Sequence, residues 1–176
     1  MGSDHGDHPL PAELDLADGD RIESVDVIGG GDEDDAASPR VSGFDGIGTR
    51  REARERALSL LYEAEQRNLS PLAVVLDELP VAPDAFAADL VRGVSENQSD
   101  IDATIAGYSK SWPIERMPAI DRALLRLGIF ELTETDVPTG AVISEAVELA
   151  KRYSTDDSHK FVNGMLARIA EDTEGR

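Results

Sequence analysis

The chain has 176 residues, no cysteine and a formal net charge of -19. The length fits a single domain, and the lack of cysteine excludes disulfide frameworks, cysteine nucleophiles and cysteine metal sites. The sequence opens without a basic segment followed by an apolar one, and no run approaches the roughly 18 apolar residues of a membrane helix. We therefore expect a cytoplasmic protein that does not contact membranes.

The acidic charge is concentrated in the first quarter of the sequence. Residues 1–48 hold 13 acidic and 2 basic residues, a net charge of -11, whereas residues 49–176 hold 23 acidic and 15 basic residues, a net charge of -8. The first segment is rich in Gly, Asp, Pro and Ser and has no helical or alternating periodicity. Such a composition cannot bury enough apolar surface to offset the entropy of ordering the chain. We predict a disordered acidic leader over 1–48 and a folded domain over 49–176.

From Thr49 onward, apolar residues recur at helical spacing between Pro, Gly and Asp signals. The first predicted helix covers about 50–67. Ser70 and Pro71 have the residue types preferred at the N-cap and at the first position of a second helix. A third helix is predicted within PDAFAADLVRGVSEN, where Phe, Leu and Val recur every four residues.

Four further helices complete the predicted domain. The fourth lies within 99–112, and the fifth, within 117–134, is apolar around most of its circumference, which is typical of a central, buried helix. The sixth, within 136–153, ends in a Lys-Arg pair that suits a helix C-terminus. The seventh covers 158–170. With no paired strand signals, the sequence predicts an all-α fold, a compact bundle of about seven helices.

Three arginines lie in an unexpected position on the first predicted helix. The helical period places Arg50, Arg51 and Arg54 in the arc of the apolar residues rather than on the polar face. Cations in the first turn also oppose the helix dipole, at about 0.3–1 kcal/mol each. Either the arginines hold phosphates while Tyr62 offers a ring face to a base, or they are solvated at a helix start outside the bundle. The residue types leave both interpretations open.

A second candidate element is the run TDDSHKFVNGML, residues 155–166. Asp157 suits the positive end of a helix dipole, and its spacing from Ser154 fits a capping box. Phe161 begins an apolar stripe, so packing explains most of this helix. It does not explain Lys160, a cation close to the positive end of the dipole.

The sequence contains few candidate catalytic or metal-binding residues. Two of its three histidines lie in the predicted leader, within DHGDH, where the entropy of ordering opposes metal capture. No glycine-rich phosphate loop follows a predicted strand. We expect no catalytic activity, no cofactor and no metal site.

Two segments carry a family resemblance. TRREARERALSLLYEAE and AIDRALLRLGIFELTETDVPTGAVISEAVELAKRYSTDDSHKFVNGMLARI resemble the NusB family in order and spacing, so the similarity covers Thr49 to Ile169. The resemblance implies an all-helical fold of two small sub-bundles without catalytic activity. It also implies binding of the boxA segment of nascent, especially ribosomal, RNA together with NusE, a small-subunit ribosomal protein. The pair then helps to assemble an antitermination complex on RNA polymerase. A homodimer is a further candidate assembly.

Carried over by position, the resemblance also implies site residues. The implied RNA-binding residues are Arg50, Arg51, Arg54, Tyr62, Asp157, Ser158, Lys160 and Phe161. The implied protein-partner residues are Glu115, Arg116, Asp121 and Arg122. The two basic and aromatic elements of the RNA set are expected to meet in space.

Glu52 interrupts an arginine run that is continuous in some family members. Each lost phosphate contact lowers RNA affinity, so we expect weak RNA binding by the isolated domain and adequate binding once NusE adds contacts. The alternative is a protein-only helical adaptor or dimer with lost or weak RNA binding. Glu52 and the net charge of -8 over residues 49–176 favour this alternative.

Overall fold

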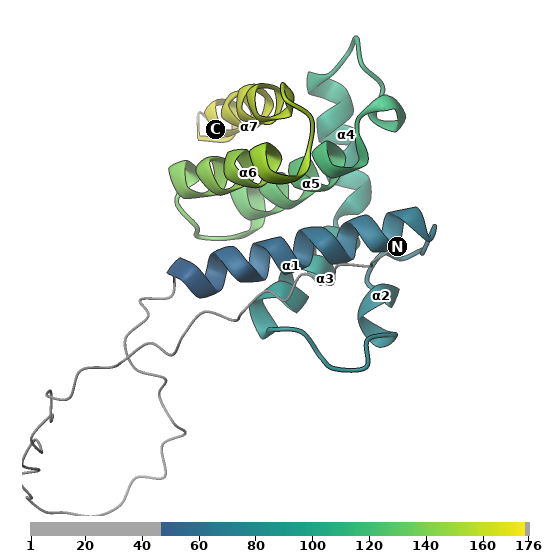
Figure 1. The fold of residues 1–176 in the computed structure, drawn as a ribbon. Helices are drawn as coiled ribbons and strands as arrows, with labels where there is room; N and C mark the ends of the chain where they lie inside the picture. The colour runs from purple at the N-terminus through teal and green to yellow at the C-terminus, as the bar shows by residue number, and fades with distance from the viewer. Residues whose placement is uncertain (1–46, 175–176) are drawn as a thin grey trace, which may run out of the picture. The chain divides into compact units, whose positions relative to one another are not determined.

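The structure, a computed structural model, describes residues 47–174 (Figure 1). These residues form seven α-helices, one 3-10 helix and no strand, which confirms the predicted all-α class. In chain order the elements are α1 (Ile47–Gln66), α2 (Val74–Asp77), α3 (Ala85–Glu96), α4 (Gln98–Tyr108), the 3-10 helix η1 (Ile114–Arg116), α5 (Ala119–Glu134), α6 (Thr139–Tyr153) and α7 (Ser158–Glu174). Apart from its last two residues, the predicted leader lies outside the described residues.

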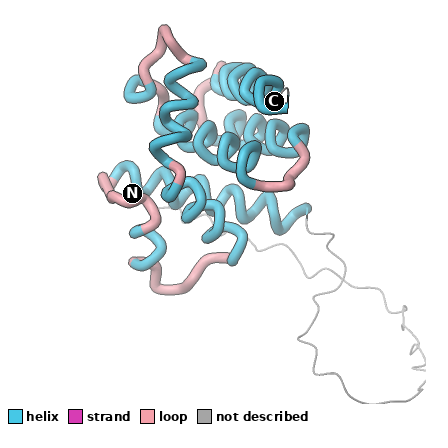
Figure 2. The backbone as a smooth tube through the Cα atoms, turned by 180° about the vertical axis from the view of Figure 1, so that it is seen from behind, coloured by secondary structure: helices cyan, strands magenta, loops and turns pink. Residues whose placement is uncertain are grey.

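The helices form two groups that share one element. Helices α1, α2 and α3 pack together, and α4, α6 and α7 pack around α5 (Figures 1 and 2). Helix α5 also contacts α1 and α3, so it belongs to both groups. Most of α5 is buried, including Leu124, Leu125 and Ile129. The sequence therefore identified the central helix correctly, because only a helix enclosed on several sides can be apolar around most of its circumference.

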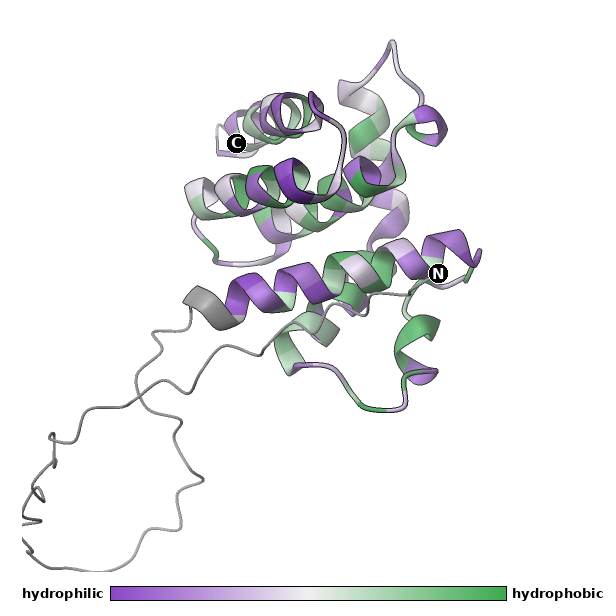
Figure 3. Cartoon of the chain, viewed as in Figure 1, coloured by the Kyte–Doolittle hydropathy of each residue, from purple (hydrophilic) through white to green (hydrophobic). Residues whose placement is uncertain are grey.

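The first helix buries one face and exposes the other, as its periodicity predicts. Ala57, Leu58 and Leu61 are buried, whereas Glu52 and Glu63 are exposed. Figure 3 shows hydrophilic positions in the first half of α1 and again at its end, with hydrophobic positions between them. The start of α1 is the part that approaches the candidate site.

The second predicted helix is much shorter than expected. Helix α2 is a single turn that begins after Ala73 rather than at Ser70. The backbone N–H of Ala73 donates to the Ser95 hydroxyl of α3 over 3.0 Å, so a side chain from another helix satisfies this donor. Leu72 and Val75 are buried and attach the segment to the core. The predicted start, with Ser70 as N-cap and Pro71 as the first helical residue, is therefore wrong: the N-cap is Ala73, which makes no side-chain cap hydrogen bond.

Helix α3 has the cap that its sequence favours. The Asp84 carboxylate accepts hydrogen bonds from the backbone N–H groups of Phe86, over 2.9 Å, and Ala87, over 3.2 Å. An N-cap of this kind stabilises a helix by about 1 kcal/mol. It fixes Phe86 in the first turn of α3, where the ring contacts arginines of α1.

Replacing Gly93 with alanine should lower the free energy of unfolding by about 2 kcal/mol, because extra atoms in a packed contact force neighbours apart. A Cβ at Gly93 of α3 would lie 2.0 Å from Cζ of Phe130 on α5. A Cβ at Gly164 would meet nothing within 4 Å, so Gly164→Ala should be neutral or stabilising. Urea denaturation of both variants tests this; equal stabilities would contradict it.

Candidate functional site

The two exposed arginines at the start of α1 contact different helices, Arg51 contacting α6 and Arg50 contacting α3. Arg51 is half-exposed and binds the Glu145 carboxylate of α6 with two donors, Nη2 to Oε1 over 2.7 Å and Nε to Oε2 over 2.9 Å. The hydrogen bond from Arg51 holds the pKa of Glu145 below its usual value. Arg50 is exposed, and its guanidinium lies 5.8 Å from the centroid of the Phe86 ring.

Arg54 occupies a different environment from the two arginines before it. Its residue is only 5% exposed, and its Nε and Nη2 atoms donate to the Glu131 carboxylate of α5 over 2.6 to 3.0 Å. Glu131 is 2% exposed. A buried counter-charge therefore explains why a cation lies in the apolar arc of α1. The arginine stripe expected on the surface includes Arg50 and Arg51, whereas Arg54 is part of the core.

Tyr62 lies further along α1, away from the arginines. It lines a cavity of about 270 Å³ together with Tyr153 of α6 and Ile120 of α5. Both tyrosines are exposed. The Tyr153 hydroxyl donates to the carboxylate of Glu55 on α1. Sequence reasoning missed Tyr153, although its position after a Lys-Arg pair at a helix end gave a basic and aromatic signal.

The start of α7 is tied to the start of α5 by a buried carboxylate. Asp121 is 1% exposed and accepts hydrogen bonds from the Ser154 hydroxyl, over 2.5 Å, and from the Ser158 hydroxyl, over 2.8 Å. Ser158 is buried as well. The predicted capping box between Ser154 and Asp157 is not formed, because the backbone N–H of Ser154 donates to the Ala150 carbonyl over 3.0 Å and its hydroxyl donates to Asp121. Asp121 and Ser158, expected at a partner surface and an RNA surface, thus lie beneath the surface.

Lys160 and Phe161 open onto a cavity of about 460 Å³ beside the end of α4. The Phe161 ring is half-buried against Trp112, with ring centroids 4.8 Å apart. Lys160 is exposed and pairs with Asp157 over 3.0 Å. Tyr108 and Arg168 also line the cavity.

The rings and cations of this cavity come from two separate segments of the chain. Sequence reasoning did not include Tyr108, Trp112 or Arg168 in the site. The helical period places Arg168 two turns after Phe161, on the same face of α7, which was the available signal.

The expected partner residues divide between two sides of α5. Arg122 donates to the backbone carbonyls of Ile114, over 2.8 Å, and Met117, over 3.1 Å, and so fixes η1. Glu115 and Arg122 line an open cavity of about 710 Å³. Arg116 is exposed on η1. Asp121, the residue before Arg122, points instead to the α6–α7 turn through its bonds to Ser154 and Ser158.

The floor of this large cavity is a network of ion pairs. Arg126 binds Asp102 over 2.7 Å and Glu65 over 2.6 Å, and Glu65 also pairs with Arg122. The partial burial of Glu65 raises its pKa, but hydrogen bonds and charges from the two arginines outweigh burial, so the pKa is lowered overall.

Replacing Glu65 with glutamine should produce a stability loss that depends on pH. Because the folded pKa is depressed, the stabilisation is fully present above the unfolded pKa of about 4.3 and is lost as pH falls through the folded value. The difference in free energy of unfolding between wild type and Glu65→Gln should therefore be largest at neutral pH and shrink in acid. Urea denaturation across this pH range measures it, and a difference independent of pH would contradict it.

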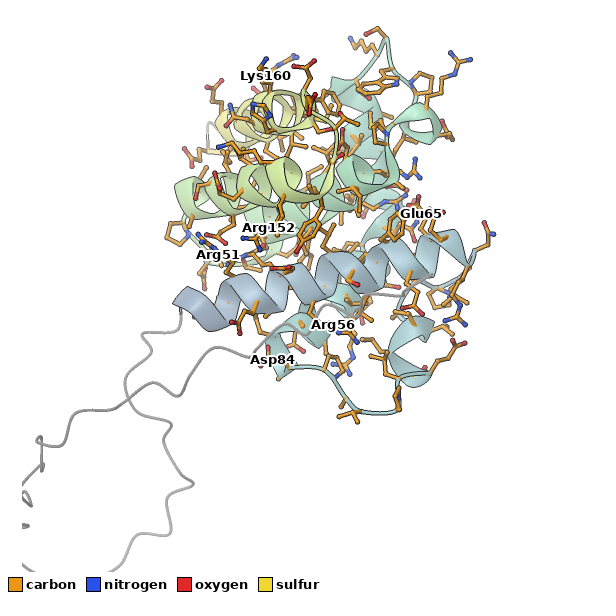
Figure 4. The ribbon with its side chains drawn as sticks, viewed as in Figure 1. Arg51, Arg56, Glu65, Asp84, Arg152 and Lys160 are labelled. Carbon is orange, nitrogen blue, oxygen red and sulfur yellow. The ribbon has the colours of Figure 1, made fainter. Side chains whose placement is uncertain are left out.

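The two elements expected to meet are separated by α6. Figure 4 shows Arg51 and Arg152 where α1 and α6 approach each other, and Lys160 on α7. Helix α6 packs against α7, and its ion pairs with α1 join Arg51 to Glu145 and Arg152 to Glu55. The site therefore consists of an arginine element on α1 and an aromatic and cationic cavity on α7, with α6 between them.

Residues 47–174 contain neither a metal site nor a membrane-spanning helix. No group of His, Asp or Glu in this range could hold a metal ion. None of the helices described here is long and apolar enough to cross a membrane.

The chain was compared with known proteins. The sequence model of the NusB family matches residues 51–171. A Transcription antitermination protein NusB from Kineococcus radiotolerans is 52% identical over 131 residues, which cover 71% of this chain and 95% of that protein.

The solved structures that resemble this chain are also NusB proteins. T. maritima NusB has a TM-score of 0.63 and 39% identity, covering 69% of this chain and 90% of that one. A chain in a crystal structure of the antitermination factors NusB and NusE in complex with dsRNA has a TM-score of 0.60 and 30% identity, covering 72% of this chain and 98% of its own length. The matched range, 51–171, includes Arg51 and Arg54 of α1, the central helix and the start of α7, and this chain belongs to the NusB family.

Proposed function

We propose that this protein is a transcription antitermination factor without catalytic activity that acts in the bacterial cytoplasm. It binds a boxA-type single-stranded segment of nascent RNA together with NusE and helps to assemble an antitermination complex on RNA polymerase. The observation that carries the proposal is the cavity on α7. There Lys160 and Arg168 flank the rings of Phe161, Trp112 and Tyr108, in a chain whose net charge is -19.

The RNA-binding roles follow from exposure and chemistry. Arg50, Arg51 and Lys160 are available to phosphates because their charged groups reach solvent. Phe161 presents part of its ring to the cavity, where an unstacked base can stack. Asp157 pairs with Lys160 and so orients its ammonium group.

Three further residues of the RNA set act differently. Arg54 and Ser158 are buried, so we assign them to holding α1 and α7 in position. Tyr62 is exposed beside Tyr153 and can receive a base or an apolar side chain of a partner at that cavity.

The partner surface lies at the open cavity beside η1. Glu115 is exposed there and attracts a basic protein such as a ribosomal protein, and Arg116 and Arg122 add donors. Asp121 does not face this surface, because it holds the α6–α7 turn through Ser154 and Ser158. Binding of NusE here adds phosphate contacts to an RNA surface whose own cations are few, which explains why the isolated domain should bind RNA weakly.

A protein-only adaptor is the second candidate, and one observation favours it. The exposed cations Arg51 and Lys160 each pair with a carboxylate of this chain, so the surface presents little uncompensated positive charge. The two candidates differ in whether RNA can replace those carboxylates.

The Arg50→Gln/Lys160→Gln variant should bind boxA RNA roughly 20-fold more weakly at about 100 mM salt, with a log–log salt slope reduced by about 1.4, because two single-strand phosphate contacts are lost. Arg92→Gln is the control, since Arg92 is an exposed cation of α3, away from the site. Fluorescence anisotropy with boxA, scrambled and duplex RNA, with and without NusE, measures these values. Absent or sequence-insensitive wild-type binding would select the protein-only adaptor, and equal affinity with and without NusE would contradict the assigned role of NusE.

A further inference from the structure

The separation of the two RNA elements leaves α6 between them. An RNA backbone that contacts Arg51 of α1 and Lys160 of α7 has to cross α6 (Figure 4). Such a strand carries a phosphate at every nucleotide, so the α6 surface it crosses needs either cations or a screen of counter-ions. The side chains that α6 exposes to solvent therefore decide whether RNA can cross it.

The end of α6 presents two exposed cations. Lys151 pairs with Glu148 over 2.8 Å, and Arg152 pairs with Glu55 of α1 over 3.1 Å. The Arg152 side chain is 57% exposed despite this pair. Its guanidinium also lies 5.9 Å from the centroid of the Tyr153 ring. Both cations therefore have a partner that holds them at the surface and leaves room for a second ligand.

The carboxylate partners of these cations are exchangeable. Exposed ion pairs contribute little to stability, so a phosphate oxygen can take the place of a carboxylate oxygen at little cost. Glu55 has a particular position because it accepts from both Arg152 and the Tyr153 hydroxyl. Release of Glu55 frees a cation and an aromatic residue in one step, and both are groups that bind single-stranded RNA.

We propose that Lys151 and Arg152 form a third phosphate-binding element, which carries the RNA backbone across α6, and that Glu55 competes with RNA for Arg152. The inference rests on the proposed RNA-binding function and adds residues to its site. The ligand is the phosphodiester backbone of single-stranded RNA. In the free protein the Glu55 carboxylate binds Arg152. In the complex a phosphate oxygen of the RNA takes its place on Arg152.

The test compares variants in which one charged side chain is replaced by glutamine. Their affinity for boxA RNA is measured by fluorescence anisotropy over a range of salt concentrations. Arg152→Gln and Lys151→Gln should each lower affinity about fivefold at about 100 mM salt and reduce the salt slope by about 0.7. Arg92→Gln is a matched control, because the Arg92 side chain is 56% exposed and also pairs with a carboxylate, Asp89. It should leave both values unchanged.

The competing role of Glu55 needs the opposite change. Glu55→Gln should raise RNA affinity by up to about fivefold, because the lost ion pair no longer opposes binding. Glu63→Gln is its control, since Glu63 is an exposed carboxylate of α1 that pairs with Arg67. Thermal melts confirm that each variant is folded.

The outcomes separate this inference from the function on which it rests. If wild type binds boxA RNA and Arg152→Gln and Lys151→Gln behave like Arg92→Gln, the third element is overturned and the proposed function stands. If wild type does not distinguish boxA from scrambled RNA, the proposed function itself fails. An unchanged affinity for Glu55→Gln, with weakened Arg152→Gln binding, overturns the competing role of Glu55.

Discussion

Replacing Glu131 with alanine should lower the free energy of unfolding by about 3–5 kcal/mol, because it leaves the Arg54 guanidinium buried without a counter-charge. The pair is almost fully enclosed and joined by donors 2.6 to 3.0 Å from the carboxylate oxygens. Denaturation in urea measures the loss. The exposed pair of Glu63 on α1 and Arg67, just after α1, gives the comparison, since Glu63→Ala should change stability far less than Glu131→Ala.

A double substitution separates structure from RNA binding at Arg54. The Arg54→Met/Glu131→Leu variant removes both charges and keeps apolar volume, so most of the stability lost by Glu131→Ala should return. If Arg54 only supports α1, this variant keeps wild-type RNA affinity. A stable double variant that has lost RNA binding would instead return Arg54 to the set of direct RNA contacts.

The sequence was sufficient for the features that depend on local periodicity. The amphipathic α1, the enclosed α5 and the all-helical class all follow from which positions are apolar, and a one-residue shift would expose the core. The exact start of α2 does not follow, because Ser95 from another helix satisfies the N–H of Ala73. Boundaries set by tertiary hydrogen bonds carry no local signal.

The candidate site was harder to predict because its charges are paired over long sequence separations. The three arginines of α1 look equivalent in sequence, yet Arg54 meets Glu131, 77 positions later, and Arg51 meets Glu145, 94 positions later. One pair is buried and the other half-exposed. The sequence shows cations in an apolar arc, whereas only the fold shows which of them reaches solvent.

The neighbours Asp121 and Arg122 illustrate the same point on α5. Successive helix positions face about 100° apart, so adjacent residues serve different surfaces. Arg122 holds η1 through the carbonyls of Ile114 and Met117. Asp121 holds the α6–α7 turn through Ser154 and Ser158. The start of α5 therefore supports both the partner surface and the RNA surface, although only the former was expected there.

Replacing Asp121 with alanine should lower the free energy of unfolding by roughly 3 kcal/mol, because the buried Ser158 hydroxyl and the partly buried Ser154 hydroxyl lose a charged acceptor. The loss should be local at first. Amide hydrogen exchange should rise at the start of α7, and RNA affinity should fall because Lys160 and Phe161 lie in the same first turn of α7 as Ser158. Asp121→Asn keeps one acceptor oxygen and should lie between wild type and Asp121→Ala.

A matched variant on the partner surface distinguishes support from contact. Arg116 is exposed on η1, so Arg116→Glu should alter NusE binding at near wild-type stability. Asp121 is 1% exposed and cannot touch a partner without rearrangement, so Asp121→Ala should act on stability and on the α7 element together. If Asp121→Ala kept wild-type stability and α7 exchange rates but lost NusE binding, Asp121 would be a contact residue, and the hydrogen bonds from Ser154 and Ser158 would not be what positions the start of α7.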